Sequence, residues 1–305
     1  MRWVILAVVL LMPFAGNAQP LDRAMTSVVS VLPQWAPDVR RQEEPEGSGV
    51  VILDGQTIVT ALHVVDKALS IRVRTLEGDI LTARLIGRDR ATDLAILTIE
   101  KTIGAIEFVN RELELGEKVC AIGNSFGLGL SVSCGVISGT HRAGVGFNAV
   151  EDFVQTDAAV NPGASGGALV TAEGKFVGLL SAIFTKTSDA NIGINFAVSA
   201  RLTNAVAAQL KKNGRVKRPI SGMKLDLVPA KGEVGRLGAR IVSVRPGFLG
   251  EKAGLKAGDI ILRAGGRRVR KPKDFVSAMS GLLGMDTLEI EIDRGGAGLK
   301  ILMKK

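Results

Sequence analysis

Tyrosine is absent from this chain of 305 residues, which also has only 10 phenylalanines, two tryptophans, two histidines and two cysteines. Aliphatic side chains must therefore fill the interior, and the aromatic stacking surfaces of proteins that bind single-stranded nucleic acid are not expected. The chain has no Cys-x-x-Cys pair and no cluster of cysteine with histidine, which argues against a zinc site. We predict no cofactor, no metal and no nucleic-acid partner.

The chain also lacks an apolar run of the length that an ordinary membrane-spanning helix needs, about 20 residues. Its longest run, residues 3–14, follows Arg2 and precedes the small residues Gly16 and Ala18. This arrangement is typical of a signal peptide, residues 1–18, with cleavage before Gln19. A retained membrane anchor is the alternative. Either one predicts that the rest of the chain is periplasmic or secreted.

Short apolar runs rich in β-branched residues, broken by glycine, aspartate and asparagine, make up most of residues 26–200. This spacing is typical of an all-β sandwich or barrel. Helical periodicity first appears at 200–212, where Leu202, Val206 and Leu210 form an apolar stripe. We expect this helix to close a β domain that covers residues 26–210. The clearest strand-like runs are residues 49–53, 57–60, 70–74, 94–99, 118–122, 175–181 and 193–198.

Residues 211–219 carry five positive charges, a glycine and a proline, and we interpret them as a basic linker. Residues 220–305 form a smaller unit with predicted strands near 239–245, 258–263 and 287–293, and predicted helices near 249–254 and 272–282. Charge is divided unevenly between the two parts. Residues 1–210 hold 17 basic and 21 acidic side chains, whereas residues 211–305 hold 22 basic and nine acidic ones. This asymmetry indicates two modules with different partners.

Cys120 and Cys134 lie in two strand-like runs separated by the turn-rich residues 123–130. In a symmetric hairpin the two positions would face each other closely enough to form a disulfide. The predicted export would permit such a bond. A pair of buried free thiols is the alternative, and the sequence does not decide between them.

Three segments together point to nucleophilic catalysis. His63 ends a predicted buried strand, Asp93 directly precedes another, and Ser165 lies in the glycine-rich stretch Gly-Ala-Ser-Gly-Gly. A serine hydroxyl is a poor nucleophile at neutral pH unless a neutral imidazole accepts its proton, and a carboxylate on the other ring nitrogen fixes the tautomer of that imidazole. The order His, Asp, Ser is the chymotrypsin-like order. We therefore predict Ser165 as nucleophile, His63 as base and Asp93 as the orienting carboxylate.

The reaction also needs N–H donors fixed in advance for the developing oxyanion. A glycine at 163 lets the chain turn so that its N–H and that of Ser165 point to one spot. We include Ala164, which lies between them, in the predicted oxyanion hole. His141 is the only other histidine; it lies in the glycine-rich stretch 139–146, and we interpret it as a surface loop residue.

These segments, with Gly-Ser-Gly at 47–49 and the stretches 121–124 and 191–197, resemble the HtrA (Deg) family of trypsin-like serine proteases with a C-terminal PDZ domain. The resemblance covers about residues 26–305. It implies a mainly β fold, with two six-stranded chymotrypsin-like barrels, a cleft between them that holds the site, and a small α+β PDZ domain. It also implies homotrimers, and loops around 124–131, 139–152 and 183–192 that switch between inactive and active arrangements.

The resemblance also assigns roles to residues around the predicted site. It implies that Ser181 helps to orient Asp93. It places Ile194, Asn195 and Phe196 near the pocket for the residue before the cut, which would take small or medium aliphatic side chains. The family usually has asparagine where this chain has Ala164. We expect activity to survive this change, with a resting oxyanion loop that is less ordered.

Residues 220–305 resemble a PDZ domain, which implies a loop that binds the C-terminal carboxylate of a peptide added to the sheet edge. The matching residues are Ile220, Ser221, Gly222 and Met223, of which Ser221 is more polar than the family pattern. A basic cluster in the same unit either steers acidic peptides or an anionic membrane surface toward the PDZ domain, or only serves solubility. The cluster comprises Arg263, Arg267, Arg268, Arg270, Lys271 and Lys273.

The sequence therefore favours an ATP-independent serine endopeptidase of the cell envelope that cleaves unfolded or misfolded proteins. The alternative is a peptide-binding chaperone or regulatory scaffold with little proteolytic activity. The presence of all three predicted catalytic residues favours the enzyme.

Overall fold

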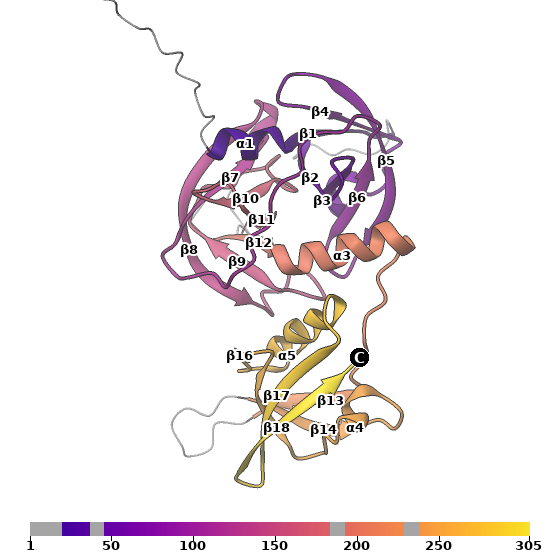
Figure 1. Ribbon diagram of the computed structural model, residues 1–305, viewed down its shortest axis with the longest axis vertical. Coiled ribbons are helices and arrows are strands. Elements are labelled where there is room, and N and C mark those ends of the chain that lie inside the picture. Colours follow the sequence, from indigo (N-terminus) through magenta and orange to yellow (C-terminus); the bar gives the residue numbers. More distant parts are fainter. Residues whose placement is uncertain (1–19, 37–45, 184–192, 229–237) are drawn as a thin grey trace, which may run out of the picture.

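The computed structural model describes residues 20–36, 46–183, 193–228 and 238–305 (Figure 1). The predicted signal peptide, residues 1–18, lies outside the described residues. A short helix, α1 (Pro20–Thr26), leads into the first strand. None of the helices in the described part of the chain is long and apolar enough to span a membrane.

The first barrel is closed, with its strands joined in the order β1-β2-β3-β6-β5-β4. Its interior is aliphatic, as the scarcity of aromatic residues predicts: Val31, Val51, Ile58 and Leu97 are fully buried in one cluster. A one-turn helix, α2 (Leu62–Val65), directly follows the third strand. The strands are β1 (Val28–Gln34), β2 (Gly47–Ile52), β3 (Thr57–Ala61), β4 (Ser70–Arg74), β5 (Ile80–Asp89) and β6 (Leu94–Thr98).

The second barrel is also closed, in the order β10-β11-β12-β9-β8-β7. Together the two barrels confirm the predicted mainly β, chymotrypsin-like architecture. A short 3-10 helix, η1 (Ser125–Gly127), lies in the turn between the first two strands of this barrel. The strands are β7 (Lys118–Gly123), β8 (Ser131–Arg142), β9 (Phe153–Thr156), β10 (Ala168–Thr171), β11 (Phe176–Ile183) and β12 (Asn195–Ser199).

The β7–β8 hairpin carries both cysteines. Cys120 and Cys134 are direct partners in its register, and their sulfurs are joined in a disulfide with a Cα–Cα distance of 4.0 Å. Of the two alternatives that the sequence leaves open, the structure has the bonded one. The bond links the strand before the turn 123–130 to the strand after it.

The helix α3 (Ala200–Asn213) packs across both barrels. Ser199 caps its first turn by accepting a hydrogen bond from Leu202 N, and Gly214 ends it in the left-handed conformation. Leu202, Val206 and Leu210 are buried, as predicted from their periodicity, in a core that includes side chains of both barrels. The helix runs to Asn213, so the first three residues of the predicted linker are helical.

The C-terminal unit lies beyond α3, on the side of that helix away from the barrels (Figure 1). Its sheet has the order β13-β14-β15-β17-β18, with β16 paired to β15, so that β13 is an edge strand. Phe275, Ile261 and Ile290 are buried in its own core. Its elements are β13 (Met223–Leu227), β14 (Ala239–Val244), α4 (Leu249–Lys252), β15 (Ile260–Ala264), β16 (Arg267–Arg268), α5 (Pro272–Met279), η2 (Ser280–Leu283), β17 (Thr287–Arg294) and β18 (Ala297–Lys304).

The interpretation of His141 as a surface loop residue is wrong. Strand β8 extends through it to Arg142, and its Nδ1 lies 3.0 Å from Oδ1 of the fully buried Asp152. The glycines of 139–146 suggested a loop, but Gly139 pairs with Gln155 within the barrel, beside a shift in register. Glycine is found at such irregularities inside strands as well as in loops.

Candidate active site

His63 and Asp93 are held together at one end of the first barrel. Asp93 directly precedes β6 and has a positive φ of 57°, a conformation that aspartate tolerates better than most residues. Its main-chain oxygen accepts a hydrogen bond from Leu62 N at 2.8 Å. Its Oδ1 accepts one from His63 N at 3.0 Å, and its Oδ2 lies 2.5 Å from His63 Nδ1. The carboxylate thus fixes both the main chain and the ring of His63.

Ser165 lies in the loop between β9 and β10, and this loop packs on the same end of the first barrel. The Ser165 carbonyl accepts a hydrogen bond from Ser48 N at 2.9 Å. Gly166 has a φ of 85°, and a Cβ there would lie 2.2 Å from Ser48 O and 3.0 Å from Ala61 N. Only glycine permits this approach. Any other residue would have a strained main chain at this positive φ, and its Cβ would clash with Ser48. Because Ala61 is two residues before His63, the approach brings Ser165 to the end of the barrel that holds His63 and Asp93.

The Pro162–Gly163 peptide is oriented by the turn after β7. Pro162 O accepts a hydrogen bond from Phe126 N at 2.7 Å. The peptide is trans, as are all those described, so the Gly163 N–H points away from that turn. Within the described ranges, neither the Gly163 N–H nor the Ser165 N–H has a hydrogen-bond acceptor in the chain. Both donors are therefore available for an oxyanion.

The prediction that Ala164 N–H contributes to the oxyanion hole is wrong, because that group donates to Asn161 O at 3.0 Å. Ala164 is itself buried, and a Cβ placed on the neighbouring Gly123 would lie 3.1 Å from the Ala164 Cβ. The loop is thus packed against β7 at this position even though it lacks the amide side chain typical of the family.

Ser48 connects the two barrels at this loop, and sequence reasoning gave it no role. Its buried hydroxyl donates to Gly163 O at 2.8 Å and accepts from Asn124 N at 2.8 Å. The side chain of Asn124 donates in turn to Glu46 at 2.6 Å. A serine between two glycines in a strand is the only sequence signal, and its partners lie 76 and 115 residues away.

Ser181 lies beside the Ser165 loop, since its neighbour Leu180 exchanges two main-chain hydrogen bonds with Gly166 and Gly167. Ser181 is buried at a break in the register between β11 and β12. In the described part of the chain its hydroxyl makes no hydrogen bond with Asp93. The contact that the family resemblance implies is therefore not formed here.

Asn195 and Phe196 are the first two residues of β12, and Ile194 directly precedes them. The Asn195 side chain donates to Ala158 O at 2.8 Å, at the beginning of the loop that leads to Ser165. The ring of Phe196 is buried, 5.8 Å from the ring of Phe147. The three predicted pocket residues are thus adjacent to the Ser165 loop, and Phe147 joins them from a different segment.

The predicted carboxylate-binding loop leads into β13, the free edge of the C-terminal sheet. The carbonyls of Ser221 and Gly222 accept hydrogen bonds from Gly250 N at 2.8 Å and Arg245 N at 2.9 Å. Among the residues that the structure describes, the N–H groups of Ser221 and Gly222 have no acceptor. Met223 N, in contrast, donates to Ser221 Oγ at 3.3 Å, so the serine occupies one of the predicted donors.

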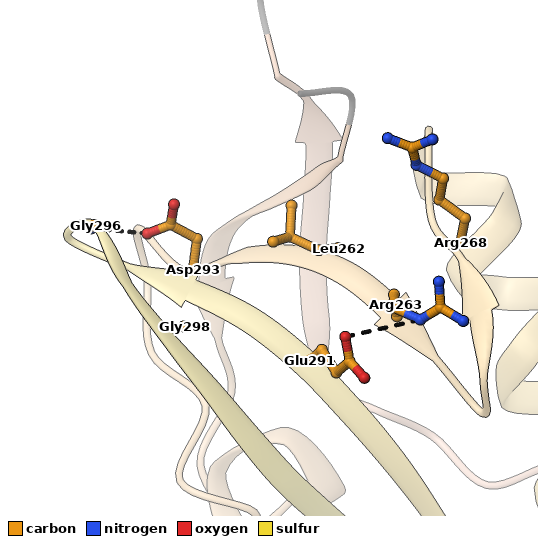
Figure 2. A pocket seen from close by; sticks show the side chains of 7 residues that line it. All are labelled: Leu262, Arg263, Arg268, Glu291, Asp293, Gly296 and Gly298. Carbon is orange, nitrogen blue, oxygen red and sulfur yellow. Dashed lines mark hydrogen bonds and ion pairs between the residues drawn. The ribbon is translucent and has the colours of Figure 1, made fainter. Parts of the chain in front are cut away.

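The predicted basic cluster does not form one surface. Arg267 is only 12% exposed and donates to Asp152 of the second barrel at 2.9 Å. Figure 2 shows Arg263 and Arg268 beside a shallow pocket of the C-terminal sheet, with Arg263 3.7 Å from Glu291. Arg270 lies 3.9 Å from Asp274. Several of these charges are therefore compensated within the chain. No group of three acidic, histidine or cysteine side chains among the described residues could hold a metal ion.

Comparison with known proteins finds two protein families, one in the barrel region and one in the C-terminal unit. A model of the trypsin-like peptidase domain matches residues 47–179, and a PDZ domain model matches residues 240–284. The chain is 38% identical over 232 residues to the periplasmic serine endoprotease DegP of Escherichia coli strain K12. It is 35% identical over 265 residues to a probable periplasmic serine endoprotease, DegP-like, of Rhizobium meliloti strain 1021.

These alignments cover 73% and 84% of this chain but 49% and 52% of the two relatives, so the chain spans about half their length. Two solved structures match over nearly their whole length. The HtrA-type protease AlgW with a tripeptide has a TM-score of 0.72 and 30% identity, covering 93% of this chain and 95% of that one. The serine endoprotease from Yersinia pestis has a TM-score of 0.61 and 31% identity, with coverage of 94% and 96%.

Proposed function

Because the chain belongs to the HtrA family of trypsin-like serine proteases with a PDZ domain, we propose that it is an ATP-independent serine endopeptidase. Its substrates would be unfolded or misfolded proteins of the cell envelope. The 2.5 Å contact between His63 Nδ1 and Asp93, on the barrel end against which the Ser165 loop packs, is the observation that carries this proposal.

In the proposed reaction Ser165 Oγ attacks a peptide carbonyl while His63 Nε2 takes the hydroxyl proton. Asp93 keeps the other ring nitrogen protonated and stabilises the imidazolium that forms. The N–H groups of Gly163 and Ser165 stabilise the oxyanion. His63 then protonates the leaving amine, and water hydrolyses the acyl-enzyme in a second attack assisted by the same base. Each step uses only water and groups of this chain, so no nucleotide is needed.

We further propose that the PDZ domain binds peptide C-termini, at the loop before β13 and along the free edge of that strand. The N–H groups of Ser221 and Gly222, which have no acceptor among the described residues, support this role. Pocket residues 194–196 would receive a small or medium aliphatic side chain. The names of the relatives support a periplasmic location. Assembly into a homotrimer and contact with an anionic membrane surface remain predictions, the first from resemblance and the second from the basic cluster.

Digestion of an unfolded substrate tests the enzyme directly. The wild-type chain is expected to cut casein after aliphatic residues. The C-terminal residues of the resulting peptides, mapped by mass spectrometry, would then be mainly aliphatic. Ser165→Ala is expected to lose activity by about 10³-fold or more. If the wild type and Ser165→Ala degrade casein at the same rate, the enzyme proposal fails. If neither cuts casein but both prevent its aggregation, the chaperone or scaffold is the better description.

A further inference from the structure

The segment before β9, residues 143–150, is shaped around one buried carboxylate. Glu151 is only 4% exposed. Its Oε1 accepts hydrogen bonds from the N–H groups of Gly146, Phe147 and Asn148 at 2.9, 2.8 and 3.0 Å. Its Oε2 accepts one from Val145 N at 2.8 Å. Four successive main-chain donors thus converge on a single carboxylate, as in the concave anion sites that backbone N–H groups form.

This arrangement requires Glu151 to be ionised. Burial alone would raise the pKa of Glu151, but the four main-chain hydrogen bonds outweigh burial and hold the pKa below its usual range. A neutral side chain of the same size would present an NH₂ group or a hydroxyl to part of this ring of donors. The fold of residues 143–150 therefore depends on the charge at 151 and on the number of acceptors it offers.

The segment that Glu151 shapes reaches across to the turn that carries Asp93. Asn148 Nδ2 donates to Thr92 O at 3.1 Å, and Val150 N donates to Ala91 O at 2.8 Å. Ala91 and Thr92 are the two residues immediately before Asp93. A segment of the second barrel thereby holds the turn of the first barrel from which the Asp93 carboxylate projects.

The same segment also reaches the predicted pocket. The ring of Phe147, which donates its own N–H to Glu151, lies 5.8 Å from the ring of Phe196 and 6.3 Å from that of Phe153. Phe196 follows Asn195, which is bonded to the loop that leads to Ser165. The Glu151 carboxylate therefore positions the Phe147 ring beside Phe196. It also positions the two hydrogen bonds, from Asn148 and Val150, that hold the turn before Asp93.

We propose that Glu151 is a positioning residue for the peptidase reaction: it holds residues 143–150 so that Asn148 and Val150 fix the Asp93 turn and Phe147 borders the substrate pocket. This inference rests on the proposed function for its kinetic consequence, but not for its structural one. Its neighbour Asp152 has a different role, since its side chain contacts His141 and Arg267. Displacement of reacting groups by about 1 Å can cost about 10²-fold in rate.

Hydrogen–deuterium exchange of the full chain, followed by mass spectrometry, tests the structural part without relying on activity. Glu151→Gln is expected to speed exchange at residues 145–148 and also at Leu62 and His63, whose N–H groups donate to Asp93. Glu117→Gln is the matched control, because Glu117 is a largely buried carboxylate bonded to Arg111 and to Glu114 N. Faster exchange confined to 145–148 would overturn the positioning role.

Kinetics with a short peptide substrate test the catalytic consequence. In Glu151→Gln we expect kcat to fall about 10- to 100-fold at temperatures where the protein is fully folded. Asn148→Ala should reproduce part of the loss in kcat, whereas Phe147→Ala should mainly raise KM or change the preferred aliphatic residue. Wild-type kcat in folded Glu151→Gln would overturn the proposal. If that variant does not fold, wild-type kcat in Asn148→Ala would overturn it.

An inactive wild type would refute the proposed function and leave the exchange experiment to decide on the positioning role of Glu151.

Discussion

The junction between the two barrels and the junction between the barrels and the PDZ domain are built from different chemical groups. Between the barrels, Ser48 N donates to Ser165 O and Val150 N donates to Ala91 O, both through main-chain atoms. At the PDZ junction the buried Asp152 carboxylate receives Arg267 at 2.9 Å and lies 3.0 Å from His141. In the linker, Arg218 donates to Asp89 at 2.8 Å.

Because the two junctions differ in their chemical groups, they respond differently to pH and salt. Main-chain hydrogen bonds carry no net charge and cannot titrate, so the barrel junction keeps its geometry over a wide range of salt, and over a wide range of pH as long as Glu151, which shapes residues 143–150, stays ionised. Ion pairs weaken when a partner changes its protonation state, and their exposed parts are screened by salt. The barrel junction is therefore the less variable part of the molecule, and docking of the PDZ domain is the part that solution conditions alter most.

The largest effect is expected from Asp152→Ala, which removes the carboxylate that Arg267 and His141 share. The almost fully buried Arg267 would then lack a counter-charge, at a cost of about 3 kcal/mol to the docked arrangement. We expect a larger radius of gyration by small-angle X-ray scattering and faster hydrogen exchange in α5. Asp286→Ala, which removes an exposed carboxylate, is the control. An unchanged radius and unchanged exchange would mean that Asp152 does not hold the PDZ domain.

A smaller effect is expected from Ser48→Ala, which leaves Gly163 O and Asn124 N without their buried partner. This loss costs about 2 kcal/mol, and we expect it to appear as a fall of about 10- to 30-fold in kcat with little change in KM. Ser277→Ala is the matched control, since its buried hydroxyl lies 3.4 Å from Asp152 at the other junction. Equal kcat in the two variants would remove the distinction between the junctions.

The pH dependence of stability should separate the junctions further. Burial alone would lower the pKa of His141, but the hydrogen bonds and negative charges of Asp152 and Glu112 together outweigh burial and raise the pKa. The His141 contribution is therefore complete below the unfolded value near 6.5 and is lost as pH rises through the folded pKa. The other charged groups at this junction are Arg267, Arg201 and Glu112.

We therefore expect the difference in unfolding free energy between wild type and His141→Gln to be larger at pH 6 than at pH 9, measured by chemical denaturation. Glu151 behaves in the opposite sense, because its lowered pKa gives a contribution that is present above about 4.5 and is lost in acid. A His141→Gln difference that does not change with pH would contradict the assignment.

The smallest effect is expected from Ala164→Asn, which restores the residue typical of the family at the oxyanion loop. The loop is already fixed by the bonds of Ser48 to Gly163 and of Phe126 to Pro162. We therefore expect peptidase activity to be preserved or raised, and the turnover of a short peptide measures this. A large loss of turnover would show that the buried Ala164 site does not accept the larger side chain.

Helices and strands with a regular local pattern of apolar residues could be predicted from the sequence. The predicted bounds of the strand Ser70–Arg74 agree with the structure at both ends, and those of α3 agree within one residue. In both elements apolar residues recur at a regular spacing without interruption. Strand β5 was not recognised, since Leu85 and Ile86 are exposed on it and its register shifts between Leu85 and Gly87. Such an irregularity breaks the alternation on which the prediction depends.

The same limit applies to the site. His63, Asp93 and Ser165 stand out because each lies in a distinctive local segment and the three occur in a known order. The roles of Ser48 and Glu151 depend on partners that only the folded chain brings together, as with Asn148 and Thr92, which are 56 residues apart. The donor at Ala164 was wrongly assigned for the same reason, since the sequence does not reveal that Asn161 O already accepts its N–H.

Labelling with an alkyl fluorophosphonate, which reacts with activated serine hydroxyls, tests most directly whether Ser165, His63 and Asp93 act as one unit. Intact-mass analysis and peptide mapping would locate the adduct and give its rate of formation. We predict one adduct, on Ser165, and a fall in labelling rate of about 10³-fold or more in His63→Ala and in Asp93→Ala. An adduct at another residue, or a rate on Ser165 that does not change in His63→Ala, would contradict the account.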